Sequence, residues 1–414
     1  MSIIEPRILK GTRDFGPDDM AKRDLVMGKI RAILQRYGFD TIETPILNYA
    51  ETILGKYGEE GDRLTYHFDD AGKRHIALPY DITVPVARFV STHAHELPLP
   101  FKQYAIQRVW RAEKPQKGRL REFYQCEVNV IGTRSLVADA EIARVMAHVF
   151  RELDLDVTIK VNSRRLMNQV IESLGPIEDP NEVIRAIDKM DKIGRDGVTA
   201  QLTKVGLSED QIEPLFDAFE NQKFDDFDTT EIDEFLTLCD EFGIRDVIKF
   251  DPYLARGLDY YTGIIYEVTS NEMDLGSICG GGRFDDLCSM FSKQEFPGVG
   301  VAFGFERIMI ILNELGKLGD IPLSAQVMVA YFDEEGRANN LAMIQELTDA
   351  GINSFMYVEP AKLAKQFKYA DRKKVPLVLT AGPDERANNQ VTLKNMLTGE
   401  QETISRADLL AKLS

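Results

Sequence analysis

The chain has 414 residues, 44% hydrophobic and 28% charged, with a formal net charge of −17; this is typical of a globular protein of one to three domains and excludes a disordered or fibrous chain. No run of 18 apolar residues occurs, and four acidic residues stand among the first twenty, which excludes a transmembrane helix and a secretory signal. Four cysteines without a CxxC pair argue against a disulfide scaffold or a structural zinc site and favour a reducing, cytoplasmic location.

The charge is unevenly distributed along the chain. Residues 206–247 contain 14 acidic side chains against Lys223 and Arg245, a net charge of −12. Residues 101–122 and 361–374 each carry a net charge of +5. Charges farther apart than about 10 Å are largely screened at ordinary salt, so an acidic protein with two basic segments can still bind a polyanion.

The first predicted elements are a helix and a strand. Val26, Ile30, Ile33 and Leu34 recur at helical spacing, which predicts a helix over about 18–37. Residues 39–46 read as a strand interrupted by Pro45. A proline cannot donate a ladder hydrogen bond, so this strand is expected at a sheet edge or an interface.

A β-hairpin is predicted next. Residues 103–111 and 123–131 form its strands, joined by a polar loop that is basic around Lys114–Gly118. Alternation in the second strand places Gln125, Glu127 and Asn129 on one face. The hairpin therefore carries a basic loop and one polar, functional face.

The remaining chain divides into three stretches. Residues from about 165 to 245 read as a helical, acidic insertion, and residues 247–310 return to strands, glycines and a final helix. Residues 315–324 are a candidate linker. Beyond it, strands over 326–332, 352–358 and 375–380 alternate with helices over 339–350 and 361–374, which predicts a small, largely parallel sheet that residues 390–397 may extend by one strand.

Several chemistries are excluded by missing motifs. There is no GxxxxGK[ST], GxGxxG, HExxH or GxSxG sequence, and the close histidine pair His93 and His95 reads as a surface turn. Arginines instead stand beside glycines and aromatic residues, at positions 111, 119, 256 and 307. Guanidinium groups bind phosphate oxygens in pairs and glycines admit close backbone approach, so a polyphosphate site is predicted.

These segments resemble the histidyl-tRNA synthetases, a class II aminoacyl-tRNA synthetase family. KGTRD (10–14) with the following helix and Pro45 is similar to the amino end and motif 1, and RAEKPQKGRLREFYQ (111–125) to motif 2. RGLDYY (256–261) and GGGRFD (280–285) resemble the two histidine signatures, and GVGVAFGFER (298–307) resembles motif 3. LPYDITVPVAR (78–88) and KQFKYAD (365–371) also match, so the resemblance runs in order along nearly the whole chain.

The resemblance implies an α+β fold. Its class II catalytic core, an antiparallel sheet flanked by helices, would span residues 1–322 and include the helical insertion at about 165–245. An α/β anticodon-binding domain would span 325–414. It also implies a histidine–tRNA ligase, with ATP, Mg²⁺, L-histidine and histidine tRNA as substrates or partners and a homodimer built through motif 1. No metal site formed by protein groups alone is expected.

The resemblance also implies roles for individual residues. Arg256, Arg111 and Gln125 would be catalytic, and ATP would be bound by Arg111, Glu113, Arg119 and Arg307. The substrate histidine would be bound by Asp81, Thr83, Gln125, Asn129, Arg256, Tyr260 and Tyr261, with core packing an open alternative for both tyrosines. The tRNA contacts would be Gln116, Lys117, Lys365 and Arg372.

Two positions depart from the family pattern on the side that faces histidine. Asn129 stands where a carboxylate is usual, and Phe284 where a tyrosine is usual. The main alternative function is a non-catalytic paralogue, the regulatory subunit of ATP phosphoribosyltransferase, which lacks an anticodon domain. Related synthetases for proline, threonine or glycine and a non-catalytic RNA-binding module are further alternatives. The retained arginines, the signature at 256–261 and residues 325–414 favour the histidine enzyme.

Overall fold

The computed structural model describes residues 3–55, 57–257, 260–319, 321, 323 and 325–413, without the side chains of residues 58–60. The chain divides into two compact units. The first comprises Met1–Asp14 and Leu25–Lys317, and the second comprises Phe15–Asp24 and Leu318–Ser414. In the described part of the chain, no helix has the length and apolar character needed to cross a membrane.

The first unit is built on an eight-stranded sheet. Its six central strands pair antiparallel, and a short strand is added in parallel at each edge. In spatial order the strands are β1 (Asp40–Thr41), β5 (Phe101–Trp110), β6 (Glu122–Ile131), β11 (Gly298–Gly304), β10 (Cys279–Phe284), β9 (Ile264–Ser270), β7 (Val157–Ser163) and β8 (Ile248–Phe250). The α+β class with an antiparallel core is confirmed.

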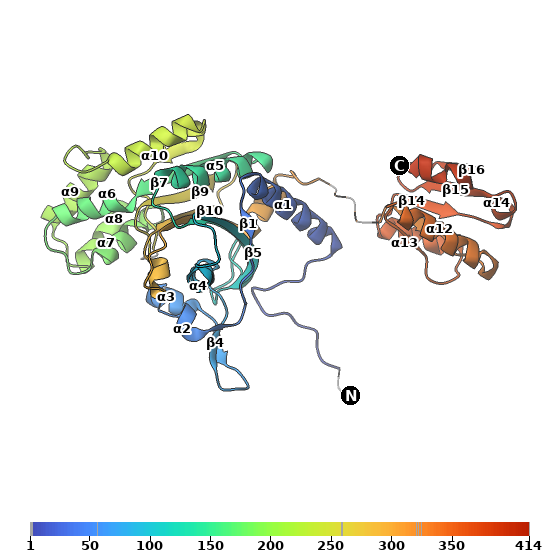
Figure 1. The fold of residues 1–414 in the computed structure, drawn as a ribbon, viewed down its shortest axis with the longest axis horizontal. Coiled ribbons are helices and arrows are strands. Elements are labelled where there is room, and N and C mark those ends of the chain that lie inside the picture. The colour runs from blue at the N-terminus through green and yellow to red at the C-terminus, as the bar shows by residue number, and fades with distance from the viewer. Residues whose placement is uncertain are drawn as a thin grey trace. The chain divides into compact units, whose positions relative to one another are not determined.

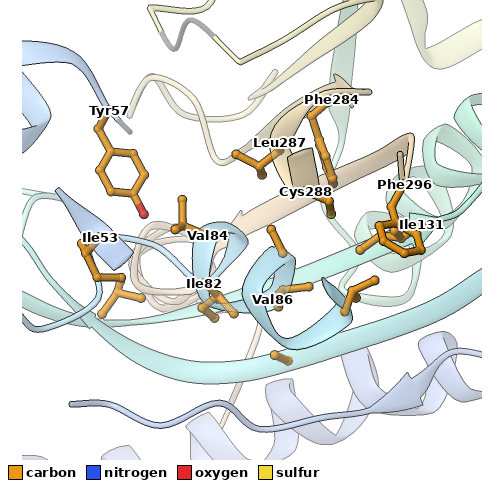
Figure 2. Packing of buried hydrophobic residues seen from close by; sticks show 14 of the residues in the cluster. Ile53, Tyr57, Ile82, Val84, Val86, Ile131, Phe284, Leu287, Cys288 and Phe296 are labelled. Atoms are coloured by element: carbon orange, nitrogen blue, oxygen red, sulfur yellow. The ribbon is translucent and has the colours of Figure 1, made fainter. Parts of the chain in front are cut away.

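Helices lie on both faces of this sheet (Figure 1). One face is covered by α5 (Leu136–Glu152), whose Phe150 ring lies 5.7 Å from that of Phe303. The other face packs against α4 (Thr83–His93), and Figure 2 shows Val84 and Val86 of this helix in the apolar cluster that also contains Ile131 and Phe296. Helix α4 covers only part of its face, so the polar side chains of β6 lie beside its first turn.

Smaller elements complete the first unit. A three-stranded sheet joins β2 (Asn48–Tyr49), β4 (His75–Ala77) and β3 (His67–Asp69). Around it and the main sheet lie α1 (Pro17–Arg36), which crosses the division between the units, α2 (Ala50–Ile53), α3 (Gly58–Leu64), η2 (Leu287–Met290) and α11 (Phe305–Glu314). The helix predicted over 18–37 is thus α1.

The strand predicted over residues 39–46 is wrong beyond its start. The last ladder bond runs from the amide of Ile42 to the carbonyl of Tyr104. At Thr44 the Gln107 side chain bonds both the amide and the carbonyl, at 3.1 and 2.7 Å. Pro45 has no amide hydrogen, so the chain leaves the sheet before it, and a side chain replaces the ladder.

The predicted helical insertion is present. It consists of α6 (Arg164–Ser173), α7 (Pro180–Ile187), α8 (Met190–Lys204), α9 (Glu209–Glu220) and α10 (Thr230–Glu241), followed by η1 (Arg245–Val247). Buried apolar residues at helical spacing, such as Val183, Ile184 and Ile187, form its core. Pro180 begins α7, and the Asp179 side chain caps it by accepting a hydrogen bond from the Asn181 amide.

The second unit contains a five-stranded sheet in the order β13 (Ser354–Met356), β12 (Val327–Val329), β14 (Leu377–Thr380), β15 (Gln390–Asn395) and β16 (Gln401–Ser405). The first three strands are parallel, whereas β15 and β16 are antiparallel. The expectation of a largely parallel sheet is therefore only half right. The chain reverses through α14 (Pro383–Ala387) between β14 and β15, and it reverses again at Gly399, whose φ is +77°, between β15 and β16. The other helical elements are η3 (Glu334–Gly336), α12 (Arg337–Asp349), α13 (Leu363–Arg372), η4 (Arg406–Asp408) and α15 (Leu409–Leu413).

Candidate active site

One face of the central sheet is lined by residues with little or no side chain. Gly300 of β11 pairs with Gly282 of β10, and Ala302 pairs with Gly280. On the adjacent strand β6, Asn129 stands opposite Gly300 and Glu127 opposite Ala302. We call Gly280, Gly282 and Gly300 the glycine floor.

The glycine floor makes room for three of the predicted site residues. A Cβ on Gly300 would lie 1.8 Å from Oδ1 of Asn129, and one on Gly282 would lie 2.9 Å from Cδ1 of Tyr261. A Cβ on Gly280 would lie 2.5 Å from Nη1 of Arg256. Real Cβ contacts of this length do not occur, so any side chain at these positions would displace a site residue.

Two carboxylates are buried beside the floor. Asp81 accepts hydrogen bonds from the Tyr57 hydroxyl at 2.8 Å and the Val84 amide at 3.3 Å. Glu127 accepts from the Thr83 hydroxyl at 2.7 Å. Burial raises the pKa of Asp81, and burial together with the charge of Asp81 raises the pKa of Glu127 to about 8. Two buried acidic groups of like charge favour a cationic guest.

Asn129 is tied to this pair. Its Nδ2 donates to Oε1 of Glu127 at 2.9 Å, while its Oδ1 lies over Gly300. The alternation predicted for β6 is therefore confirmed for these two residues. The sequence pattern placed Glu127 on the polar face without giving it a role. Its position between Gln125 and Asn129, both assigned to the substrate, could have indicated that it also belongs to the site.

The two tyrosines of the 256–261 segment lie against the same surface. Their ring centroids are 4.7 Å apart, and the Tyr260 ring meets Phe284 edge to face at 6.5 Å. Tyr261 is 7% exposed and lies over Gly282. Leu258 and Asp259 lie outside the described residues, and so would any ion pair between Arg256 and Asp259.

Two acidic residues from different elements lie near Arg256. Its Nη1 is 3.4 Å from Oε2 of Glu267 on β9. Asp188, directly after α7, approaches from the insertion: its Oδ2 is 3.6 Å from the point where a Cβ of Gly257 would stand. Burial raises the pKa of Asp188, and the charge of Arg256 counteracts the rise. Asp188 was not singled out from the sequence.

The three arginines assigned to ATP converge from two segments. The Arg111 Nε donates to the carbonyl of Tyr80 at 3.0 Å, and its guanidinium stacks 4.3 Å from the Tyr80 ring. Arg307 donates from Nε to the carbonyl of Gly118 at 3.1 Å and from Nη1 to the carbonyl of Ser277. Burial lowers the pKa of Arg307, and the charges of Arg119 and Arg111 lower it further.

Such a cluster of like charges fits a polyanion. Glu113 is 4.0 Å from Arg119, and it is the only acidic side chain that the described residues place in an ion pair with one of these three arginines. Gly118 has φ +74° and lies against the Arg307 side chain. The turn of the basic loop at Gly118 therefore helps to fix the position of the Arg307 guanidinium. Gln125 is buried, and its Oε1 has no hydrogen-bond partner among the described residues.

The predicted tRNA contacts are divided between the two units. In the first unit, Gln116 pairs with Arg119 through backbone hydrogen bonds, and Lys117 forms an ion pair with Glu314 at 2.6 Å. In the second unit, Lys365 is 3.2 Å from Glu359, and Arg372 is exposed. Helix α13 presents these cations to solvent because Gln366 and Ala370 occupy its buried side.

The described residues contain no cluster of three or more His, Cys, Asp or Glu side chains arranged to hold a metal ion. His93 and His95 each lie within 3.3 Å of Glu96 on the surface.

The chain is similar in sequence to known proteins of one family. Residues 11–308 match the family described as Histidyl-tRNA synthetase, and residues 326–414 match the family described as Anticodon binding domain. The chain is 38% identical to a histidine–tRNA ligase of Porphyromonas gingivalis over 97% of each chain. It is 36% identical to that of Phocaeicola vulgatus over 98% of each chain.

Solved structures show the same fold. The histidyl-tRNA synthetase of Nostoc sp. PCC 7120 superposes with a TM-score of 0.84, covers 99% of each chain and is 29% identical. A Bacillus halodurans C protein described as an ATP phosphoribosyltransferase regulatory subunit/histidyl-tRNA synthetase superposes with a TM-score of 0.73 at 18% identity, covering 88% of this chain and 97% of its own. At that identity the second likeness concerns the fold alone.

Proposed function

The chain belongs to the histidyl-tRNA synthetase family, and from that premise we propose that the glycine floor and the side chains around it carry its chemistry. The chain is an aminoacyl-tRNA synthetase that uses ATP to join histidine to tRNA. The regulatory-subunit alternative has less support, since several curated relatives that match nearly the full length are histidine–tRNA ligases.

The reaction has two steps. In the first, a carboxylate oxygen of histidine attacks the α-phosphorus of ATP, the bond to the β-phosphate breaks, and pyrophosphate leaves from histidyl-adenylate. In the second, a hydroxyl of the terminal ribose of tRNA attacks the adenylate carbonyl, loses its proton, and AMP leaves. Both steps depend on positioning and on neutralising charge.

The buried pair Asp81 and Glu127 is the single observation that supports the histidine position most strongly. A cationic α-ammonium group needs acceptors, and Asp81, Thr83 and Gln125 supply them beside Glu127. The imidazole would lie toward Asn129, Tyr260 and Tyr261. Asn129 contributes an amide in place of a charge, while Glu127, two residues earlier on the same face, supplies the carboxylate.

The histidine carboxylate would then point toward Arg256. This guanidinium lies over Gly280 of β10. Ala302 of β11 separates Gly280 from Glu127 of β6, because it pairs with both of them. The guanidinium of Arg256 can bond both the attacking carboxylate and the α-phosphate, because a fork of donors reaches two anions at once. Arg111, Arg119 and Arg307 would hold the triphosphate, with Glu113 on the adenine side. Mg²⁺ would enter bound to ATP.

Transfer to tRNA involves both units. Gln116 and Lys117 of the basic loop would contact the acceptor end, and Lys365 and Arg372 of α13 would contact the anticodon stem. Residues 325–414 would form the anticodon-binding domain, 1–322 the catalytic core, and about 165–245 its insertion. The enzyme would act in the cytoplasm as a homodimer.

Histidine-dependent exchange of pyrophosphate into ATP tests this proposal. The wild-type chain is expected to exchange with L-histidine and not with proline, threonine or glycine. Gln125→Leu should raise the histidine KM because the buried oxygen that accepts from the ammonium is lost. Exchange without added amino acid, or none with histidine, would contradict the assignment.

A further inference from the structure

A fully buried amide lies next to the proposed histidine site and has no hydrogen-bond partner in the described part of the chain. Gln103 of β5 is 0% exposed. Among the residues that the structure describes, no group accepts from its Nε2 or donates to its Oε1. Folded proteins rarely bury both halves of an amide unsatisfied, because the lost water contacts are not repaid. Such a group is a candidate for a ligand contact.

The register of the sheet places Gln103 on the functional face. It pairs directly with Asn129, and Asn129 pairs with Gly300 of the glycine floor. Directly opposed side chains of antiparallel strands share a face and lie about 4.5–5.5 Å apart at Cβ. Gln103 therefore stands beside the residue proposed to face the imidazole.

The next row of the sheet is entirely apolar. It runs from Phe101 through Ile131 and Gly298 to Phe284. The side chains of Phe101, Ile131 and Phe284 belong to the apolar cluster of which Figure 2 shows a part. Gln103 and Asn129 are thus the last polar side chains of this face before the apolar cluster. An unpaired amide has no packing reason to stand there.

A second glutamine on the same strand face provides a comparison. Gln107 bonds the backbone of Thr44 through both its Oε1 and its Nε2. Gln125, opposite Gln107, is assigned to the substrate ammonium, and its Oε1 has no partner within the residues that the structure describes. The fold therefore satisfies the structural amide and leaves unsatisfied the amides that face the substrate.

We propose that Gln103 is a specificity-determining residue for the amino acid side chain, whose amide binds a ring nitrogen of histidine directly or through one water molecule. This rests on the proposed placement of histidine beside Glu127 and Asn129. An amide offers both a donor and an acceptor, so it matches either tautomer of a neutral imidazole. It also supplies hydrogen bonding at a site where Phe284 has no hydroxyl.

The test is Gln103→Met, an apolar side chain of similar length. Calorimetric titration with L-histidine alone should show affinity weakened about tenfold or more, and the histidine KM in pyrophosphate exchange should rise in parallel. The ATP KM should stay within about twofold, since the arginine cluster is untouched. The unfolding temperature should stay or rise, because an unpaired buried amide is removed.

Gln107→Met is the matched control on the same strand. It should lower the unfolding temperature by removing the bonds to Thr44 and leave the histidine KM unchanged. Gln103→Leu repeats the test with a second side chain if the methionine variant does not fold. Unchanged histidine affinity in a folded Gln103 variant would overturn the proposal, whereas absent exchange in the wild type would instead contradict the placement of histidine.

Discussion

Arg256 is the residue on which formation of the adenylate should depend most. Two anions, the histidine carboxylate and the α-phosphate, must meet, and this guanidinium is held over Gly280 by Glu267. Arg256→Ala and Arg256→Lys should each lower kcat of histidine-dependent exchange roughly 10²-fold or more, because lysine keeps the charge but not the fork of donors. The ATP KM should change far less.

The contrasting role for Arg256 is purely structural. Its ion pair with Glu267 would then only support the sheet, and the variants would lose thermal stability while the folded fraction exchanged at a near-normal rate. Glu267→Gln serves as the control, since it removes the ion pair and keeps the guanidinium. A stability loss in Arg256→Lys without a loss of kcat would show that the residue is not catalytic.

Glu127 should make the stability of the substrate-free protein depend on pH. Its folded pKa is raised to about 8 by burial and by Asp81, while an unfolded glutamate titrates at about 4.3. Between these values the folded state holds the extra proton, so the contribution of Glu127 to stability falls as pH rises from about 4.3 to 8. Glu127→Gln should therefore flatten the fall in unfolding temperature over this window.

Histidine binding should lower the raised pKa of Glu127 again. A bound cation favours the ionised carboxyl, so the wild type should release protons on binding histidine near pH 7. Calorimetry in buffers of different ionisation enthalpy measures this release, and Glu127→Gln should abolish most of it. Equal release by both proteins would exclude Glu127. Asn129 donates to Glu127, so Asn129→Leu should remove a buried polar partner at a cost of about 1–3 kcal/mol and raise the histidine KM, whereas Asn129→Asp should bind histidine as well or better.

At the scale of the element, α13 is the clearest functional surface. Lys365 and Arg372 are exposed on this helix, and the ion pair of Lys365 with Glu359 joins two side chains more than 60% exposed, so it holds the lysine only weakly. Lys365→Ala with Arg372→Ala should raise the tRNA KM and flatten its dependence on salt. Pyrophosphate exchange without tRNA should not change.

Lys412→Ala supplies the control for α13. Lys412 is a half-exposed lysine of the same unit, paired with Glu402 at 2.7 Å, so the variant removes one surface charge outside α13. It should leave the tRNA KM near the wild-type value. If the α13 variant and this control behave alike, the basic helix is only a solvated surface.

At the scale of the whole molecule, the assembly is predicted from exposed apolar residues. Leu47, just before β2, and Tyr49, within it, are 59% and 58% exposed, and the chain after Thr44 has left the eight-stranded sheet. We expect this segment and α1 to form a homodimer interface. Light scattering at micromolar concentration should give about twice the 46.8 kDa of one chain, and Leu47→Asp should shift the mass toward the monomer. A wild-type mass near that of one chain would contradict the expectation.

The sequence by itself determined the local order of this protein. Alternation over 123–131 is a property of the extended chain, so it predicted that Glu127 and Asn129 share a face. Helical spacing likewise predicted α1 and the insertion helices, because each depends on neighbours three or four residues away. The ordered motifs from residue 10 to residue 371 indicated the family and most of the candidate site.

The tertiary structure alone decided what those residues meet. Strand order brings β6, β11 and β10 together, and only this juxtaposition turns Gly280, Gly282 and Gly300 into one floor. It also brings Asp188 from the insertion toward Arg256 and lets Gln107 bond Thr44 after β1 has ended. It leaves Gln103 buried with no hydrogen-bond partner among the described residues. Each of these depends on contacts between residues far apart in the chain, which local pattern cannot encode because hydrogen-bond satisfaction and burial are settled only by packing.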